Sequence, residues 1–363
     1  MSILQSLRRG GGGSKSLIGL DISSSAVKLL ELGRRGEQYS VEAYAIEPLP
    51  PNVVVDKQVA DPKVVGETIA RAVDKAGTRT KNAAVAVAGS SVITKVINMP
   101  ANVGEHEMEA QIKAEADQYI PYALDEVNLD FQIIGPSAKD ATSVDVLLAA
   151  CRKEQVDSRV AALDIAGLSA RVVDIEVYAL ENACQFLRHQ MPESGKGKTI
   201  AIVDMGASNT SVLIMHDMVP VYTRDQAFGG KQLTEDVMRH FGMSFDEANK
   251  AKKGGELPEA YNTEVLPRFI DDLAQQIDRS FQFFFASATQ VTALDQVILA
   301  GGCAHIPTMQ AAIQDRLNMP CTTARPFAKM AVTGRAKPAQ LAKDEAALLI
   351  ACGLACRAFD EER

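Results

Sequence analysis

Two aspartates in this sequence, Asp21 and Asp204, lie in apolar surroundings, where a carboxylate is expected only if it has a partner or a function. Each closes an apolar stretch, LIGLD (17–21) or TIAIVD (199–204), and each precedes a turn of small residues and a second apolar stretch. A carboxylate in such surroundings is costly to bury without a partner. One such aspartate alone could simply cap its turn. The same pattern of apolar stretch, aspartate and small-residue turn occurs twice, far apart in the chain. This repetition favours a shared chemical role for the two aspartates.

The turns after the two aspartates could receive phosphate. Ser23–Ser25 follow the first aspartate, and the run GASNT (206–210) follows the second. Short side chains let a phosphate approach the backbone, where N–H and hydroxyl groups can form an anion nest. A carboxylate cannot bind phosphate itself, but it can hold the water shell of Mg²⁺, which bridges phosphate oxygens. Asp21 and Asp204 therefore predict a facing pair around one magnesium nucleotide.

Two pairs of glycines lie further along the chain. Gly229-Gly230 precede an amphipathic helical pattern, and Gly301-Gly302 follow the apolar strand QVILA. Glycines in these places let the backbone pass close to a flat ring or a phosphate. The stretches GGGGSKS (10–16) and SGKGKT (194–199) only imitate a P-loop, because a P-loop follows a strand and opens a helix. Both are expected to be ordinary loops.

Composition narrows the class of protein. A chain of 363 residues is expected to form two or more subdomains. The net charge of −8 and the lack of a basic block argue against a nucleic-acid partner. The longest apolar run, 346–356, is about half a membrane span, so no transmembrane helix is predicted. The six cysteines lack CxxC spacing and are expected to be buried thiols, not zinc ligands or disulfides.

Strand and helix patterns alternate along the whole chain, which predicts an α/β protein with mixed sheets. Residues 1–16 are expected to be a tail, and residues 62–76 show helical spacing of apolar residues. Residues 90–172 predict a compact strand-helix-strand-strand-helix-strand unit. Helices are also expected at 178–190 and, last, at about 339–359.

The order of these motifs carries a family resemblance. With two Asp-turns, a Gly-Gly helix and a strand ending in Gly-Gly, the chain resembles the actin/Hsp70/sugar-kinase superfamily. It resembles more closely the PilM family of actin-like proteins of type IV pilus assembly, with the division protein FtsA as the next nearest. The resemblance covers about residues 17–358. The segments that carry it are LIGLDISSSAVKLLEL, INMP, DQYIPY, IVDMGASNTSVLI, FGGKQLTEDV and ILAGG.

The resemblance implies an actin-like fold, built from two lobes of duplicated RNase H-like units with an inserted 1C-type subdomain. Residues 1–16 would be a flexible N-terminal tail. The implied subdomains are 1A (17–89, 173–197 and 339–363), 1C (90–172), 2A (198–230 and 291–338) and 2B (231–290).

The resemblance also assigns roles around one ATP or ADP with Mg²⁺. Asp21 and Asp204 would face the metal, and Glu176 would position the hydrolytic water. Ser23 stands where the family often has Gly, and Asn249 where a ribose-binding carboxylate is expected, so at most a slow ATPase is predicted. The residues implied to contact the nucleotide are Ser23, Ser24, Ser25, Gly206, Ser208, Asn209, Thr210, Gly229, Gly230, Lys252 (near adenine), Gly301 and Gly302.

By the same resemblance, the partner is the short cytoplasmic N-terminal segment of PilN, bound in a groove between subdomains 1A and 1C. The chain would then be cytoplasmic, peripheral to the inner membrane through its partners, able to self-associate, and involved in twitching motility. Two alternatives stay open. One is an FtsA-like filament-forming division ATPase, although the acidic end LACRAFDEER does not match a basic membrane helix. The other is a sugar-kinase-type phosphotransferase, for which no catalytic base or sugar pocket can be placed.

Overall fold

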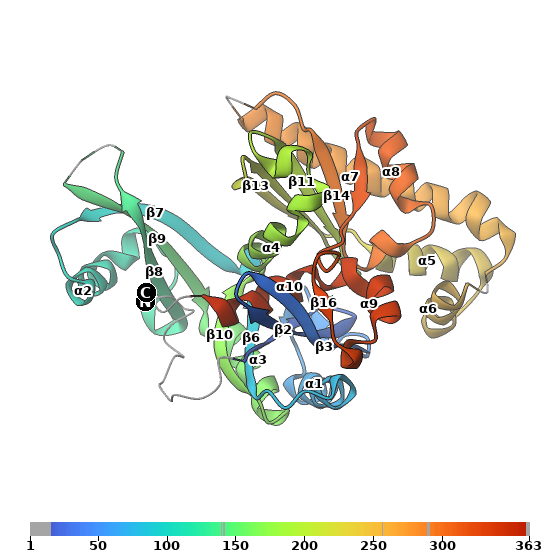
Figure 1. Cartoon of the computed structure of the whole chain (residues 1–363), viewed down its shortest axis with the longest axis horizontal. Coiled ribbons are helices and arrows are strands. Elements are labelled where there is room, and N and C mark those ends of the chain that lie inside the picture. Colours follow the sequence, from blue (N-terminus) through green and yellow to red (C-terminus); the bar gives the residue numbers. More distant parts are fainter. Residues whose placement is uncertain (1–15, 139, 141, 256, 289–290, 361–363) are drawn as a thin grey trace. The chain divides into compact units, whose positions relative to one another are not determined.

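The computed structural model describes residues 16–138, 140, 142–255, 257–288 and 291–360. Except for Ser16, the predicted tail therefore lies outside the described residues. Two compact units divide the chain. The first unit holds the described residues up to 34, residues 42–179 and those from 354 onward, and the second holds 35–41 and 180–353. Both are mixed α/β structures, as the sequence predicts (Figure 1).

The first unit is built on a large sheet with the strand order β10-β6-β1-β2-β3. Strands β10, β6 and β1 run parallel, whereas β1 and β2 form an antiparallel hairpin. Every residue of β1 is buried because it lies in the middle of this sheet. A short strand, β16 (Ala331–Val332), pairs with the first residues of β3 inside the second unit. The bounds are β1 Ile18–Ile22, β2 Ala26–Arg35, β3 Gln38–Pro48, β6 Asn82–Val87 and β10 Ser169–Ile175.

Helix α1 (Pro62–Ala76) matches the predicted range 62–76 because residues that favour helix ends stand on both sides of it. The Asp61 side chain accepts hydrogen bonds from two backbone N–H groups of the first turn, and Gly77 closes the helix in the left-handed conformation. The buried face of α1 packs over the large sheet together with α3 (Lys153–Ile165).

A small sheet, in the order β7-β9-β8, lies within the same unit. Helix α2 (Glu105–Glu115) covers one face, and Met108 and Ile112 pack there against Ile97 and Val146 in a separate core. The predicted order of elements over 90–172 is present, but β10 pairs with β6 in the large sheet. The small sheet and its helix therefore occupy only 92–152. Its strands are β7 Val92–Pro100, β8 Val127–Pro136 and β9 Ser143–Arg152.

The second unit repeats the plan of the first. Its sheet has the order β13-β12-β11-β14-β15. Strand β11 pairs antiparallel with β12 and parallel with β14, as β1 pairs with β2 and β6. This repetition is the structural form of the duplicated Asp-turn. The bounds are β11 Thr199–Met205, β12 Thr210–His216, β13 Val219–Gln226, β14 Gln296–Ala300 and β15 Cys321–Thr323.

The later helices differ from the prediction mainly in their lengths. The helix expected at 178–190 is α4 (Glu176–Cys184) followed by a 3₁₀ segment to Gln190. The expected last helix is broken by a 3₁₀ turn at 345–348, where Glu345 is buried and paired with Arg325. The remaining helices are α5 Gly230–Phe241, α6 Phe245–Gly254, α7 Leu266–Ser287, α8 Met309–Leu317, α9 Pro338–Asp344 and α10 Leu349–Cys356.

Two further observations concern the chain as a whole. Over the described ranges, every helix is too short or too polar to cross a membrane. Near the C-terminal end, the Arg357 Nε donates to Asp174 Oδ2 at 2.6 Å, and Asp174 is fully buried on β10. This ion pair ties residues after 353 to the large sheet of the first unit.

Candidate nucleotide site

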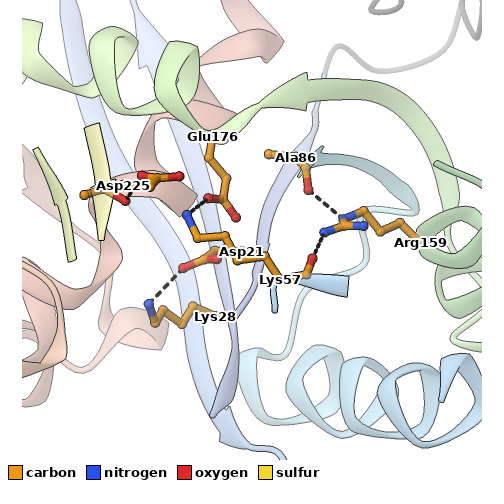
Figure 2. Close-up of polar contacts among 8 residues, drawn as sticks. Asp21, Lys28, Lys57, Ala86, Arg159, Glu176 and Asp225 are labelled. Atoms are coloured by element: carbon orange, nitrogen blue, oxygen red, sulfur yellow. Dashed lines mark hydrogen bonds and ion pairs between the residues drawn. The ribbon is translucent and has the colours of Figure 1, made fainter. Parts of the chain in front are cut away.

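The aspartate of the first Asp-turn has a lysine partner. Asp21 lies near the end of β1 and is directly opposite Lys28 of β2 in the hairpin register. The Lys28 Nζ lies 2.8 Å from Asp21 Oδ2, and the Asp21 side chain is 5% exposed (Figure 2). The ammonium offsets the cost of burying the carboxylate. A cation therefore already lies beside the carboxylate that the sequence assigns to the metal side.

The turn after Asp21 is closed by its own hydrogen bonds. The Ser23 N–H and Oγ both donate to the carbonyl of Ala26, at 3.0 and 2.9 Å. The Ser25 carbonyl accepts from the N–H of Leu49. None of Ser23, Ser24 and Ser25 has a positive φ, so serine in place of glycine causes no backbone strain here. Ser23 acts mainly as a support of the turn.

Glu176 is the first residue of α4 and follows β10 directly. Its Oε2 lies 2.7 Å from the Nζ of Lys57 (Figure 2). The Glu176 side chain is 16% exposed and the Lys57 side chain 15%. The Glu176 carboxylate is therefore held by a lysine from a distant part of the chain.

In the second unit, the loop after Asp204 packs directly on the start of α5. The Gly206 N–H donates to the Asn209 carbonyl at 2.9 Å, which closes the loop. The N–H groups of Gly230 and Lys231 donate to the carbonyls of Gly206 and Ala207 at 3.0 and 2.7 Å. The loop therefore caps the first turn of the helix.

Two of the predicted glycines are required by close approach to this loop. A Cβ at Gly229 would lie 2.6 Å from the Gly206 carbonyl oxygen. Gly301 has a φ of +83°, and a Cβ there would lie 2.4 Å from the Met205 carbonyl oxygen and 2.5 Å from Asp204 Oδ1. By contrast, a Cβ at Gly302 would meet no heavy atom within 4 Å. The second Gly-Gly pair thus contributes to the site through its first member.

Lys252 and Cys303 complete the cluster. The Lys252 Nζ, from α6, donates to the Gly230 carbonyl at 3.0 Å and to Thr234 Oγ1 at 2.7 Å, both on α5. The Cys303 thiol donates to the Gly206 carbonyl at 3.3 Å. The ammonium therefore lies at a helix N-terminus, where the helix dipole also favours anions.

The other predicted residues of the second unit lie around the same loop. Thr210 is buried at the start of β12, and its Oγ1 donates to the Phe228 carbonyl at 2.8 Å. Ser208 and Asn209 lie within the loop itself. Asn249 is half-buried on α6, one turn before Lys252. Around this loop the structure therefore brings together Gly229, Gly230, Lys252 and Gly301, whereas the Cβ position of Gly302 is open.

Several polar residues near these candidates are absent from the sequence-based set. Lys28 could have been found, because a turn at 23–25 places it opposite Asp21 in a hairpin. Asp225 lies in register with Ser211 and Asp204 across three strands, and Ser211 Oγ donates to Asp225 Oδ1 at 2.6 Å. Lys57 has no local signal, since its partner is far away in the sequence.

The carboxylates fit a hydrated magnesium ion better than a protein-made cage. Over the described ranges, no three His, Cys, Asp or Glu side chains are grouped as metal ligands. Mg²⁺ commonly keeps several waters and needs only one or two carboxylates besides phosphate oxygens. Asp204, at the end of a strand and beside a glycine turn, suits that role.

Comparison with known proteins decides the family. The sequence model described as type IV pilus assembly protein PilM matches residues 19–359. The chain belongs to the PilM family. A solved PilM-PilN type IV pilus biogenesis complex contains a chain with 26% identity and a TM-score of 0.78, and the match covers 95% of this chain and 99% of that one.

More distant matches show the fold alone. Ethanolamine utilization protein EutJ from Carboxydothermus hydrogenoformans has 14% identity and a TM-score of 0.55, with 95% and 91% of the two chains covered. MreB5 of Spiroplasma citri, solved with bound ADP, has 11% identity and a TM-score of 0.50, with 95% and 99% covered. The actin-like fold predicted from the motifs is confirmed, and this PilM family member is an actin-like component of type IV pilus assembly.

Proposed function

We propose that this PilM family member binds ATP or ADP with Mg²⁺ and serves as a nucleotide-dependent scaffold of pilus assembly. The observation that carries the proposal is the cluster in the second unit, where the loop after Asp204, the start of α5, Lys252 and the turn at Gly301 meet. Four motifs from distant parts of the sequence converge there on one helix N-terminus.

The chemistry of this cluster suits a phosphate chain. The helix N-terminus and the Lys252 ammonium favour anions, and the small residues of the loop let phosphate oxygens approach the backbone. Asp204 would hold the water shell of Mg²⁺, which neutralises phosphate charge when it is bound. Asp21 and Ser23–Ser25, in the first unit, remain a proposed second contribution to the same ligand.

Replacing Asp204 with Ala should lower the affinity for Mg-ATP at least about tenfold, or ~1.4 kcal/mol. Calorimetric titration measures this directly. Asp295→Ala is the matched control, because Asp295 lies at the other end of the same pair of strands, where it accepts from the Thr199 N–H. Equal affinities of the Asp204→Ala and Asp295→Ala variants for Mg-ATP would contradict the assignment of Asp204 to the metal side.

Hydrolysis should be slow, below about 1 s⁻¹, the lower end of the usual enzyme range. Asn249 stands in place of the ribose-binding carboxylate, and Glu176 is the single residue proposed to position the water. Steady-state phosphate release with and without added sugars tests this. Faster release, or release stimulated by a sugar, would favour a dedicated enzyme or a kinase over a scaffold.

The proposed partner is the short cytoplasmic N-terminal segment of PilN, bound between the small and large sheets of the first unit. The support is the solved PilM-PilN complex, whose similar chain is 26% identical. In addition, the face of the small sheet opposite α2 exposes Val96 (54%), next to its half-buried cross-strand partner Leu147. An apolar peptide side chain could cover this pair. Such binding would keep the chain in the cytoplasm and attach it to the inner membrane through PilN.

A further inference from the structure

We propose that Lys57 is a positioning residue that fixes the Glu176 carboxylate for the attacking water in nucleotide hydrolysis. This inference rests on the proposed nucleotide function and adds to it a residue that no sequence motif marks. Lys57, Glu176 and Arg159 all lie in the first unit, and Figure 2 labels these three residues.

Lys57 is presented by an unusual tight turn. Strands β4 (Val54–Val55) and β5 (Gln58–Val59) form a hairpin joined by only Asp56 and Lys57. Both turn residues are left-handed, with φ of 49° and 62°. Such a turn favours Asn-Gly, because a side chain at positive φ is strained. A lysine is therefore held here against its backbone preference.

A buried arginine supports this turn. Arg159 is 1% exposed, and its Nε, Nη1 and Nη2 donate to the carbonyls of Ala86, Gln155 and Lys57 at 2.7, 2.8 and 2.7 Å. Burial lowers the pKa of the Arg159 guanidinium, an effect opposed mainly by the charge of Glu176. Burying a cation on backbone carbonyls alone is costly. The result is a Lys57 backbone anchored to α3.

This anchoring determines the geometry of Glu176. The Lys57 ammonium donates to Glu176 Oε2 at 2.7 Å. Within the part of the chain that the structure describes, Glu176 Oε1 has no hydrogen-bond partner, so it can accept one from water. An exposed surface ion pair would not need a strained turn and a buried guanidinium. Their presence indicates that the direction of the carboxylate matters.

The step that Glu176 would serve is hydrolysis of the terminal phosphate. The water oxygen forms a bond to the γ-phosphorus while the bond to the β,γ-bridging oxygen breaks, and ADP leaves with that electron pair. The proton of the water passes to the released phosphate. Glu176 orients the water through Oε1 and is unchanged at the end.

The test compares hydrolysis with binding in the full chain. Lys57→Met should lower single-turnover ATP hydrolysis at least about tenfold, while calorimetric ATP affinity stays within about twofold. Lys57→Arg should recover most of the rate. Lys63→Met, at an exposed lysine on α1, is the matched control and should behave as the wild type.

A second variant protects the test from misfolding. The double change Asp56→Asn and Lys57→Gly gives the hairpin the residues that its turn favours. It removes the whole Lys57 side chain with its ammonium and replaces the Asp56 carboxylate with a neutral amide. It should lose the same share of hydrolysis. Unchanged hydrolysis in either variant overturns the inference, as does a parallel loss of ATP affinity or a wild-type chain that binds ATP without hydrolysing it. A wild-type chain that fails to bind ATP would instead contradict the proposed nucleotide function itself.

Discussion

Gly301→Ala should lower the affinity for Mg-ATP about 100-fold, or ~2.7 kcal/mol. The new Cβ would lie 2.5 Å from Asp204 Oδ1 and 2.4 Å from the Met205 carbonyl oxygen, at a φ of +83°. The Asp204 carboxylate and its loop must therefore move. The neighbouring change Gly302→Ala should have no effect on affinity, because its Cβ enters open space.

Calorimetric titration and thermal unfolding of both variants measure this difference. The unfolding midpoint separates a local change at the loop from loss of the folded unit, and a cooperative transition is expected for both variants. Equal affinities for the Gly301 and Gly302 variants would show that the loop after Asp204 does not form the nucleotide site.

The second large effect is expected when the small sheet is removed. Thr94 and Ala149 are cross-strand partners, so an Asn-Gly turn can replace residues 95–148 and leave a short hairpin. This excision removes the whole hydrophobic cluster around Met108 and Phe131, whereas Cys151 remains in the core of the large sheet. Binding of a PilN N-terminal peptide should fall below detection, a loss of at least about 100-fold, while ATP affinity stays unchanged.

A point variant makes the same test inside the full chain. Val96→Asp places a charge on the open face of the small sheet and should weaken peptide binding at least about tenfold. Val219→Asp is the matched control, because Val219 is similarly exposed (60%) in the second unit. Peptide binding that survives both the excision and Val96→Asp would place the partner elsewhere.

Local signals were sufficient for much of the fold. Asp61 and Gly77 mark the ends of α1, and the alternation around Asp204 marks a hairpin in which β11 and β12 are both buried. These features depend on neighbours in the sequence, so a single sequence reveals them. The meeting of these motifs at α5 could also be expected, but only because their order in the sequence led to a family resemblance.

Long-range contacts could not be predicted in the same way. Lys57 is 119 residues from Glu176 and 102 residues from Arg159 along the chain, and no residue type at these positions announces the pairing. The pairing of β10 with β6 is equally remote, which is why the small sheet ends at Arg152 and not at the predicted 172. Such partners are chosen by tertiary packing alone.

The ion pair between Arg357 and Asp174 also bears on the order of folding during synthesis. Its members are 183 residues apart, and Asp174 is fully buried. On a ribosome, residues 180–353 of the second unit are made before Arg357 exists. The second unit can therefore begin to fold while β10 still carries an uncompensated carboxylate. The large sheet of the first unit therefore gains this ion pair only after residue 357 has been made.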